Sequence, residues 1–256
     1  MRHLIASVAL LSLLFTGGCS LFPWGADDPT LDWSASKLYA EAKGALNGGN
    51  YEQAIQYYES LEARYPFGRY AQQAQIEIAY AYYRSGEMDS ALAAADRFVQ
   101  LHPQHPHVDY AYYLKGLANF HRGESFLDRI MPRDPSKVDP KPLRQSFQDF
   151  AQLVRRFPDS RYAEDATARM LHLRNQLADY ELYVADFYMA RSAWLAAAQR
   201  ARYVVDHYQG AESMPKALEI LYRAYRRLGM NDQAQDTLRV IETNFPELAT
   251  RLGAID

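Results

Sequence analysis

The stretch GNYEQAIQYYESLEARYPFGRY, Gly49 to Tyr70, decides the fold, because its spacing recurs along the chain. It has the features of a turn, a helix of about four turns and a Tyr-Pro stop. Tyr51, Ala54, Tyr58 and Leu61 lie on one face of that helix, and Pro66 ends it. The same spacing is repeated by Met88, Ala91, Ala95, Phe98 and Pro103; by Leu143, Ser146, Phe150, Leu153 and Pro158; by Trp194, Ala197, Ala201 and Val204, with Gln209 in place of the proline; and by Asn231, Ala234, Leu238, Ile241 and Pro246.

A second helix precedes each copy of this segment. Ala42, Ala79, Ala185 and Tyr222 stand nine residues before the first position of their copies, and Gly116 fits if an insertion separates the helices of the third copy. Each unit is therefore a helix, a turn and a helix, and such units stack because two helices cannot bury both apolar faces alone. The pattern resembles the tetratricopeptide repeat. The sequence predicts an all-α fold, an α-solenoid of five tetratricopeptide-like helix-turn-helix repeats.

The repeat register gives the domain boundaries. We expect the solenoid at residues 33–249, with repeats at 33–66, 69–103, 108–158, 161–209 and 212–246. The fourth repeat has no proline or glycine between Pro158 and Trp194, which predicts one helix of about 30 residues over 161–191. A break near 177–180 is the alternative.

An insertion at 122–140 interrupts the third repeat. Pro132, Pro135 and Pro140 show that it is not one regular helix. Loops of this length are usually functional or disordered, and its apolar side chains make it a candidate for partner contact.

The N-terminus resembles a bacterial lipoprotein signal. Arg2 precedes an apolar segment, Leu4 to Phe15, that is too short to anchor the chain permanently, and small residues lead to Cys19, the only cysteine. The resemblance implies that 1–18 is a signal peptide, that Cys19 is acylated, and that 19–32 is a lipidated tether. Thr16 departs from the usual leucine, and the alternative is an ordinary secretory signal with a free cysteine. Ser20, instead of Asp, favours the outer membrane.

Composition and motifs argue against catalysis and nucleic-acid binding. The formal net charge of −3 gives no positive field for nucleic acid. There is no GxSxG, HExxH, Walker loop, GxGxxG or CxxC motif, so we expect no catalytic residue and no cofactor beyond the acyl lipid on Cys19. His102, His105 and His107 are a candidate metal site, but prolines separate them and no acid or cysteine completes a ligand set. A rigid corner between repeats is the favoured interpretation, and no metal site is expected.

The concave face of such a stack is lined by the first helix of each repeat. The repeat register places aromatic, cationic and apolar side chains there in the first three repeats, and exposed aromatic bands mark binding sites. We predict a peptide-binding groove; the alternative is that these rings are buried in the core. The predicted groove residues are Tyr39, Lys43, Tyr80, Tyr83, Arg84, Tyr110, Tyr113 and Phe120, with Leu46, Ile76 and Leu117 on the same face.

The C-terminal repeats carry a second candidate site. Arg223, Arg226 and Arg227 make this end basic, which suits an acidic partner surface. Arg200 lies off the packing face of its helix, so we expect it to be exposed and, with Arg191, to pair with acids of a partner. The alternative is a solvated surface arginine.

Two longer segments carry a more specific resemblance. EARYPFGRYAQQAQIEIAYAYY (residues 62–83) and ADYELYVADFYMARSAW (residues 178–194), together with the lipoprotein signal, resemble the BamD family of the outer-membrane β-barrel assembly machinery. The resemblance implies a non-catalytic scaffold on the periplasmic face of the outer membrane. It also implies three kinds of partner: a BamA-like barrel-forming subunit, other lipoproteins of the complex, and the targeting signals of unfolded outer-membrane proteins. The alternative is a generic repeat lipoprotein that organises cell-wall or division factors.

Overall fold

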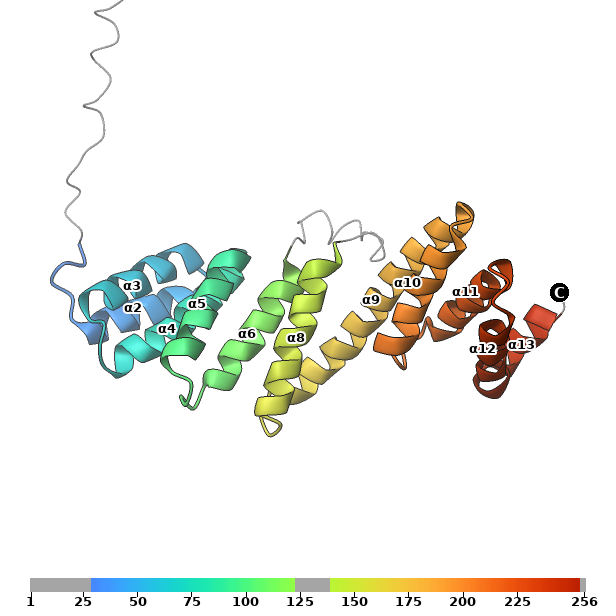
Figure 1. Ribbon diagram of the computed structural model, residues 1–256. Coiled ribbons are helices and arrows are strands. Elements are labelled where there is room, and N and C mark those ends of the chain that lie inside the picture. Colours follow the sequence, from blue (N-terminus) through green and yellow to red (C-terminus); the bar gives the residue numbers. More distant parts are fainter. Residues whose placement is uncertain (1–28, 123–138, 254–256) are drawn as a thin grey trace, which may run out of the picture.

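The computed structural model describes residues 29–122 and 139–253, which form eleven α-helices and contain no strand. Figure 1 shows these helices side by side, in pairs, along one elongated row. The helices are α2 (Ala35–Asn47), α3 (Tyr51–Arg64), α4 (Arg69–Ser85), α5 (Met88–Leu101), α6 (Val108–His121), α8 (Pro140–Arg156), α9 (Ala163–Ala190), α10 (Trp194–His207), α11 (Met214–Arg227), α12 (Asn231–Asn244) and α13 (Pro246–Gly253). The prediction of an all-α solenoid of five helix pairs is confirmed.

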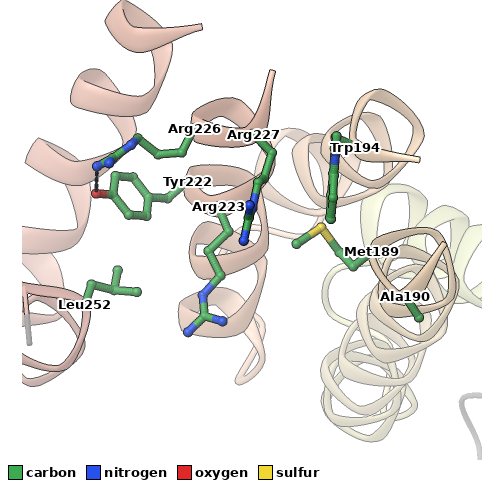
Figure 2. Close-up of a pocket in the computed structure, with 8 residues that line it drawn as sticks. All are labelled: Met189, Ala190, Trp194, Tyr222, Arg223, Arg226, Arg227 and Leu252. Atoms are coloured by element: carbon green, nitrogen blue, oxygen red, sulfur yellow. Dashed lines mark hydrogen bonds between the residues drawn. The ribbon is translucent and has the colours of Figure 1, made fainter. Parts of the chain in front are cut away.

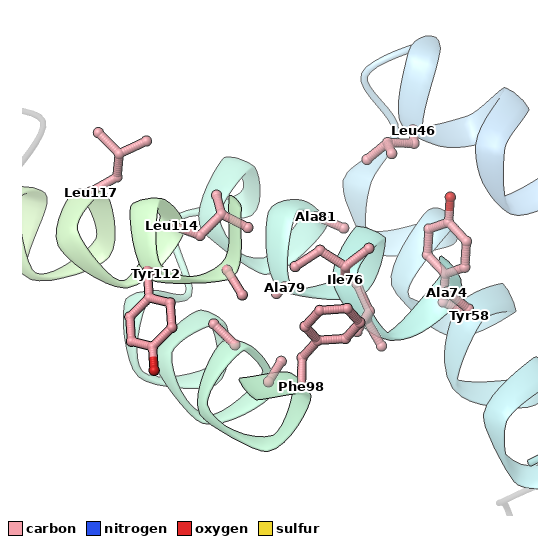
Figure 3. Close-up of a cluster of buried hydrophobic side chains, with 14 of the residues drawn as sticks. Leu46, Tyr58, Ala74, Ile76, Ala79, Ala81, Phe98, Tyr112, Leu114 and Leu117 are labelled. Atoms are coloured by element: carbon pink, nitrogen blue, oxygen red, sulfur yellow. The ribbon is translucent and has the colours of Figure 1, made fainter. Parts of the chain in front are cut away.

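The repeat register is visible in the burial of the second helices. In each second helix, the small residue three positions after the first residue and the large residue ten positions after it are buried, because both face neighbouring helices. The first set is Ala54, Ala91, Ser146, Ala197 and Ala234, and the second is Leu61, Phe98, Leu153, Val204 and Ile241. Figure 3 shows part of this core, with Tyr58 and Phe98 between the helices of the first repeats.

The approach of α6 to α8 requires a glycine at Gly116. A Cβ at this position would lie 2.4 Å from Cε1 of Phe150, which is fully buried. Ser146 adds a hydrogen bond of 2.8 Å from its hydroxyl to the carbonyl oxygen of Gly116. The third repeat therefore packs its two helices face to face despite the insertion between them.

The long helix α9 is continuous over 28 residues, as the absence of proline and glycine predicts. Its first half packs into the N-terminal core through Ala166 and Leu173, and its second half packs into the C-terminal core through Ala178 and Leu182. The extra turns of α9 thus join two hydrophobic cores.

The described residues end in a helix that the repeat pattern does not predict. The expected solenoid stops at residue 249, but α13 continues to Gly253 and buries Leu248 and Leu252 against the second core. α13 therefore extends the second core beyond the fifth repeat.

Buried Glu77 ties the first repeat to the second. It accepts hydrogen bonds from the hydroxyl of Tyr39 at 3.0 Å, from Nζ of Lys43 at 2.7 Å and from Nε2 of Gln73 at 2.9 Å. The hydroxyl of Tyr58 donates to its second oxygen. Burial alone would raise the pKa of Glu77, but these hydrogen bonds and the charge of Lys43 outweigh it, so the pKa lies below its usual value.

Glu181 in α9 plays the same part between the third and fourth repeats. It is buried, and its two carboxylate oxygens accept from Arg144 of α8 at 2.7 Å and from Arg200 of α10 at 2.8 Å. Asp149 of α8 is also fully buried, with Asn119 and Lys115 of α6 at 2.8 and 3.5 Å. Each buried acid thus joins neighbouring helices through hydrogen bonds and ion pairs.

No helix within residues 29–122 or 139–253 is both long enough and apolar enough to cross a bilayer.

Candidate functional sites

The predicted groove is a row of half-buried rings rather than an open band. The ring of Tyr80 lies 6.4 Å from that of Tyr110, which lies 5.2 Å from that of Tyr162. Tyr113 stacks on Tyr162 at 4.7 Å. Phe120 lies 6.0 Å from His172. The row therefore runs from the second repeat into the fourth.

Part of the predicted groove set is buried. Leu46, Ile76 and Leu117 belong to the core, so their assignment to the concave face is wrong. Their apolar side chains are removed from water in the N-terminal core, which stabilises the fold. Tyr39, Tyr80, Tyr83, Tyr110, Tyr113 and Phe120 pack against the same core while keeping part of each ring at the surface.

The two cations predicted for this groove already have partners within the chain. Lys43 pairs with Glu77 at 2.7 Å. The guanidinium of Arg84 lies 4.9 Å from the ring centre of Tyr51 and donates to the hydroxyl of Tyr80 at 2.6 Å. A ligand carboxylate in the groove would have to compete with these contacts.

Tyr113 shows how closely the groove is linked to the fold. Its hydroxyl donates to Asp165 of α9 at 2.6 Å, and Asp165 also accepts from Nε of Arg169 at 2.6 Å. Burial, together with the hydrogen bond and the charge of Asp165, raises the pKa of Tyr113 to about 12. Tyr162 and Asp165 were not predicted as groove residues, because they lie in the extended part of the fourth repeat that the repeat register does not align.

A cavity of about 630 Å³ lies beside α11 at the other end of the molecule. Figure 2 shows Arg223, Arg226 and Arg227 of α11 around it. Its apolar lining comes from Met189, Ala190, Trp194 and Leu252 of three other helices, and Tyr222 of α11 completes it. The three arginines of the sequence prediction are thus brought together in one hollow.

The arginines of this cavity have different surroundings. Arg223 pairs with Glu219 at 2.8 Å, and Arg226 donates to the hydroxyl of Tyr222 at 3.0 Å. The guanidinium of Arg227 lies 5.7 Å from the ring centre of Trp194. No acid in the described part of the chain pairs with Arg227. The cavity therefore combines aromatic surface with positive charge that the chain neutralises only in part.

An exposed aromatic and cationic patch adjoins the C-terminal end of α9. The guanidinium of Arg191 lies 3.6 Å from the ring centre of Phe187, and Phe187 is 48% exposed. Tyr183, one turn earlier, and Leu195 at the start of α10 are 44% and 57% exposed. Within residues 29–122 and 139–253, Arg191 has no acidic partner. The apolar members of this patch were missed, although Tyr183, Phe187 and Arg191 are spaced four residues apart along one helix face.

The side chain of Arg200 is 43% exposed, as expected for a residue off the packing face, but it is not a solvated surface arginine, because its guanidinium pairs with buried Glu181. The predicted pairing of Arg200 with acids of a partner stays a prediction. The register places Arg200 off the main packing face, yet the neighbouring α9 supplies a buried carboxylate on that side.

Two sequence predictions concern residues outside the described part of the chain. Cys19 with its signal peptide precedes it, and nearly all of the 122–140 insertion falls in 123–138.

His102, the first of the three candidate metal ligands, hydrogen-bonds Gln75 at 2.7 Å, and its ring lies 5.3 Å from that of Phe98. Among the described residues no group of three or more histidines, cysteines and acids is arranged to hold a metal ion.

Comparison with known proteins gives a consistent set of relatives. A family model described as "YfiO: Outer membrane lipoprotein" matches residues 31–240. The outer membrane protein assembly factor BamD of Neisseria meningitidis serogroup A is 51% identical over 218 residues, covering 85% of this chain and 82% of that protein. BamD of Vibrio cholerae is 39% identical over 240 residues, covering 94% of this chain and 97% of that protein. Among solved structures, the TPR2AB domain of yeast Sti1 covers 83% of this chain and 78% of its own, with 12% identity and a TM-score of 0.46.

Proposed function

The chain belongs to the BamD family of outer-membrane lipoproteins, and from this premise we propose that it is a non-catalytic scaffold of the β-barrel assembly complex. Its role in outer membrane protein assembly and its association with that membrane follow from the family. The finer proposal is that its C-terminal repeats bind a BamA-like barrel-forming subunit, while its N-terminal groove binds targeting signals of unfolded barrel proteins. Other lipoproteins of the complex are further partners.

The observation that carries the subunit contact is the Arg191 patch. The guanidinium of Arg191 stacks on the exposed ring of Phe187 and has no acidic partner among the described residues. Its charge is therefore available to pair with an acidic surface of another protein. Tyr183, Phe187 and Leu195 add apolar area of the kind that dominates interface energetics. Arg223, Arg226 and Arg227 extend the positive charge along α11.

The test reverses the charge of Arg191. Arg191→Glu should weaken binding to the periplasmic part of the barrel-forming subunit by about tenfold or more, as expected for an anchor residue. The matched control is Arg202→Glu on α10, which makes the same change of charge outside the set of patch residues and breaks a surface pair of 3.5 Å with Asp206. Equal binding of the two variants would exclude the Arg191 patch from the interface.

The groove proposal is supported by the row of aromatic residues that pack against the core and are only partly buried. Rigid aromatic side chains lose little entropy when a peptide binds, so they make effective anchors. We expect Tyr80→Ala and Tyr83→Ala to weaken binding of a synthetic signal peptide by more than about tenfold at a true anchor. Tyr113 is left unchanged in this test, because an alanine would also remove its stacking on Tyr162. Unchanged peptide affinity in both variants, with normal helical content, would refute the groove.

The anchor proposal concerns Cys19 and the periplasmic face of the outer membrane. Acylation at the thiol and the new amino terminus supplies several chains, which hold a protein stably at a bilayer. Cys19→Ala should give an exported protein that no longer enters the detergent phase when tested without its partners. Partition equal to that of the unmodified sequence would contradict lipidation.

A further inference from the structure

The turn between α3 and α4 holds an apolar ring away from the core. Phe67 is 91% exposed, the highest value among the large apolar residues that the structure describes. Pro66 restricts the backbone on one side of it, and Gly68 on the other side has a φ of 102°, a conformation that favours glycine. An apolar ring in water forgoes the free energy that burial would supply, so a partner that covers Phe67 is favoured.

The segment before α2 lies against this turn. Arg64 donates to the hydroxyl oxygen of Thr30 at 2.9 Å, and the hydroxyl of Tyr65 donates to the carbonyl oxygen of Trp33 at 3.0 Å. Leu31, between these two contacts, is 63% exposed. Figure 1 shows the segment at the outer end of the row of helices. The first repeat therefore gathers exposed apolar and aromatic side chains at its free end.

The same end of the molecule is positively charged. Nζ of Lys37 lies 4.3 Å from the ring centre of Trp33, and the guanidinium of Arg69 lies 5.1 Å from the ring centre of Tyr70. Neither cation has an acidic partner within residues 29–122 and 139–253. Asp32 is the only acid within 29–37 and 64–70, which contain three cations. The N-terminal tip is defined here as Leu31, Trp33, Lys37, Tyr65, Phe67 and Arg69.

The sequence limits how far this tip can lie from a membrane. Cys19, the proposed acylation site, stands ten residues before residue 29, where the described part of the chain begins. Ten residues span at most about 35 Å when fully extended. An acylated Cys19 would therefore keep the tip within that distance of the lipid headgroups. This step rests on the proposed lipidation, whereas the exposure and charge of the tip do not.

We propose that the N-terminal tip inserts into the headgroup region of a phospholipid bilayer, with Phe67 and Leu31 reaching the acyl chains. Trp33 and Tyr65 combine a ring with a polar atom, which suits the level of the headgroups. The two cations of the tip contact lipid phosphates. A bilayer fits better than a protein because it accepts exposed rings and cations together and lies within reach of the tip. The contact orients the solenoid at the membrane, which acylation at Cys19 does not do by itself.

The first test measures binding of the non-acylated chain to vesicles, so it does not depend on lipidation. Residues 19–256 with Cys19→Ser are mixed with vesicles of phosphatidylethanolamine and phosphatidylglycerol, and the bound fraction is measured by flotation. Phe67→Ser should lower the partition coefficient by about tenfold, and Arg69→Gln by about fivefold at low salt. The matched controls, Leu171→Ser on α9 and Arg202→Gln on α10, alter exposed residues outside the tip and should leave binding unchanged.

The second test asks whether the turn itself enters the bilayer. Trp24→Phe, Trp33→Phe and Trp194→Phe remove the tryptophans of the chain, and Phe67→Trp places a single one at the turn. Retained helical content shows that this variant is folded. We expect vesicles to shift its emission to shorter wavelength, and lipids brominated on their acyl chains to quench it.

The outcomes separate this proposal from the acyl anchor. Absence of vesicle binding, binding that Phe67→Ser leaves unchanged, or emission that vesicles do not alter would overturn the insertion of the tip and leave a protein as its partner. Lipidation is judged by the Cys19→Ala assay alone. A failure there would remove the acyl anchor without changing the result expected for the non-acylated chain.

Discussion

Arg200 offers the sharpest test of how this solenoid is held together. Its guanidinium lies 2.8 Å from one oxygen of buried Glu181, and Arg144 lies 2.7 Å from the other. A substitution at Arg200 therefore acts on three helices at once, α8, α9 and α10. Arg200→Glu replaces an attraction with a repulsion at a carboxylate that water reaches poorly.

The magnitude follows from what Glu181 loses. A hydrogen bond to a charged group contributes about 1.5–3 kcal/mol. Because the Arg200 side chain is 43% exposed, water can replace part of it, and we expect Arg200→Ala to cost about 1.5–2 kcal/mol. Arg200→Glu adds repulsion and should cost about 3 kcal/mol, at the low end for a broken buried pair because Arg144 remains. For a domain of this size that loss lowers the melting temperature by about 6–12 °C.

Urea unfolding followed by circular dichroism measures this effect, with Arg202→Glu on the same helix as the control. The control breaks only an exposed pair at 3.5 Å and should cost well under about 1 kcal/mol. A double-mutant cycle with Glu181→Gln should show that the costs of the two changes do not add. If Arg200→Glu is as stable as Arg202→Glu, the network does not stabilise the junction, and Arg200 is a surface residue after all.

Three further predictions concern the fold. Gly116→Ala should destabilise the protein by about 1–3 kcal/mol, because the new Cβ would lie 2.4 Å from the Phe150 ring, whereas Gly44→Ala, with no atom within 4 Å, should stabilise it by about 0.5–1 kcal/mol; unfolding curves that rank the two the other way would contradict the packing of α6 on α8. Glu77 has a pKa below its usual value, so its ionised form stabilises the fold above the unfolded pKa of about 4.3, and this contribution is lost as pH falls through the folded pKa. Glu77→Gln should therefore lower stability at neutral pH and much less in acid, and a pH-independent difference would refute that role. Leu248→Ala should cost about 2–5 kcal/mol if α13 seals the second core, and a negligible cost would mean that α13 is dispensable.

The repeat pattern predicted the helices well because it depends on the size and polarity of residues within each helix. Small residues such as Ala54 and Ser146 must lie where helices approach, and large ones such as Leu61 and Phe98 must fill the core, whatever the partner helix is. The absence of proline and glycine likewise favoured a continuous α9, although a break near residues 177–180 stayed open as the alternative. α13 was missed because it matches no earlier unit of the repeat.

The candidate sites were harder to predict, because exposure depends on the neighbouring repeat. The repeat register places Leu117 on the same face of its helix as the predicted groove residues Tyr113 and Phe120, but the packing of α6 buries it. Arg200 looked free because its partner Glu181 is 19 residues away on another helix. Periodicity along one helix does not reveal a carboxylate supplied by the next helix. The stacking of Arg191 on Phe187 could be inferred from sequence, because both lie on the same helix, one turn apart.

The two ends of the solenoid differ in whether their cationic side chains already have partners within the described residues. This difference affects which ligands each end can bind. In the first repeats Lys43 is committed to Glu77, and Arg84 lies among tyrosines, so the groove offers mainly ring surface. At the C-terminal end Arg191 and Arg227 rest on aromatic rings without an acid from the described residues. A cation that lies over a ring keeps its hydrogen-bond donors at the edge of the guanidinium, where an incoming carboxylate can reach them. These contacts favour the proposed apolar recognition at the N-terminal rings and the proposed recognition of acidic groups at the C-terminal repeats, and α9 connects the two cores that support them.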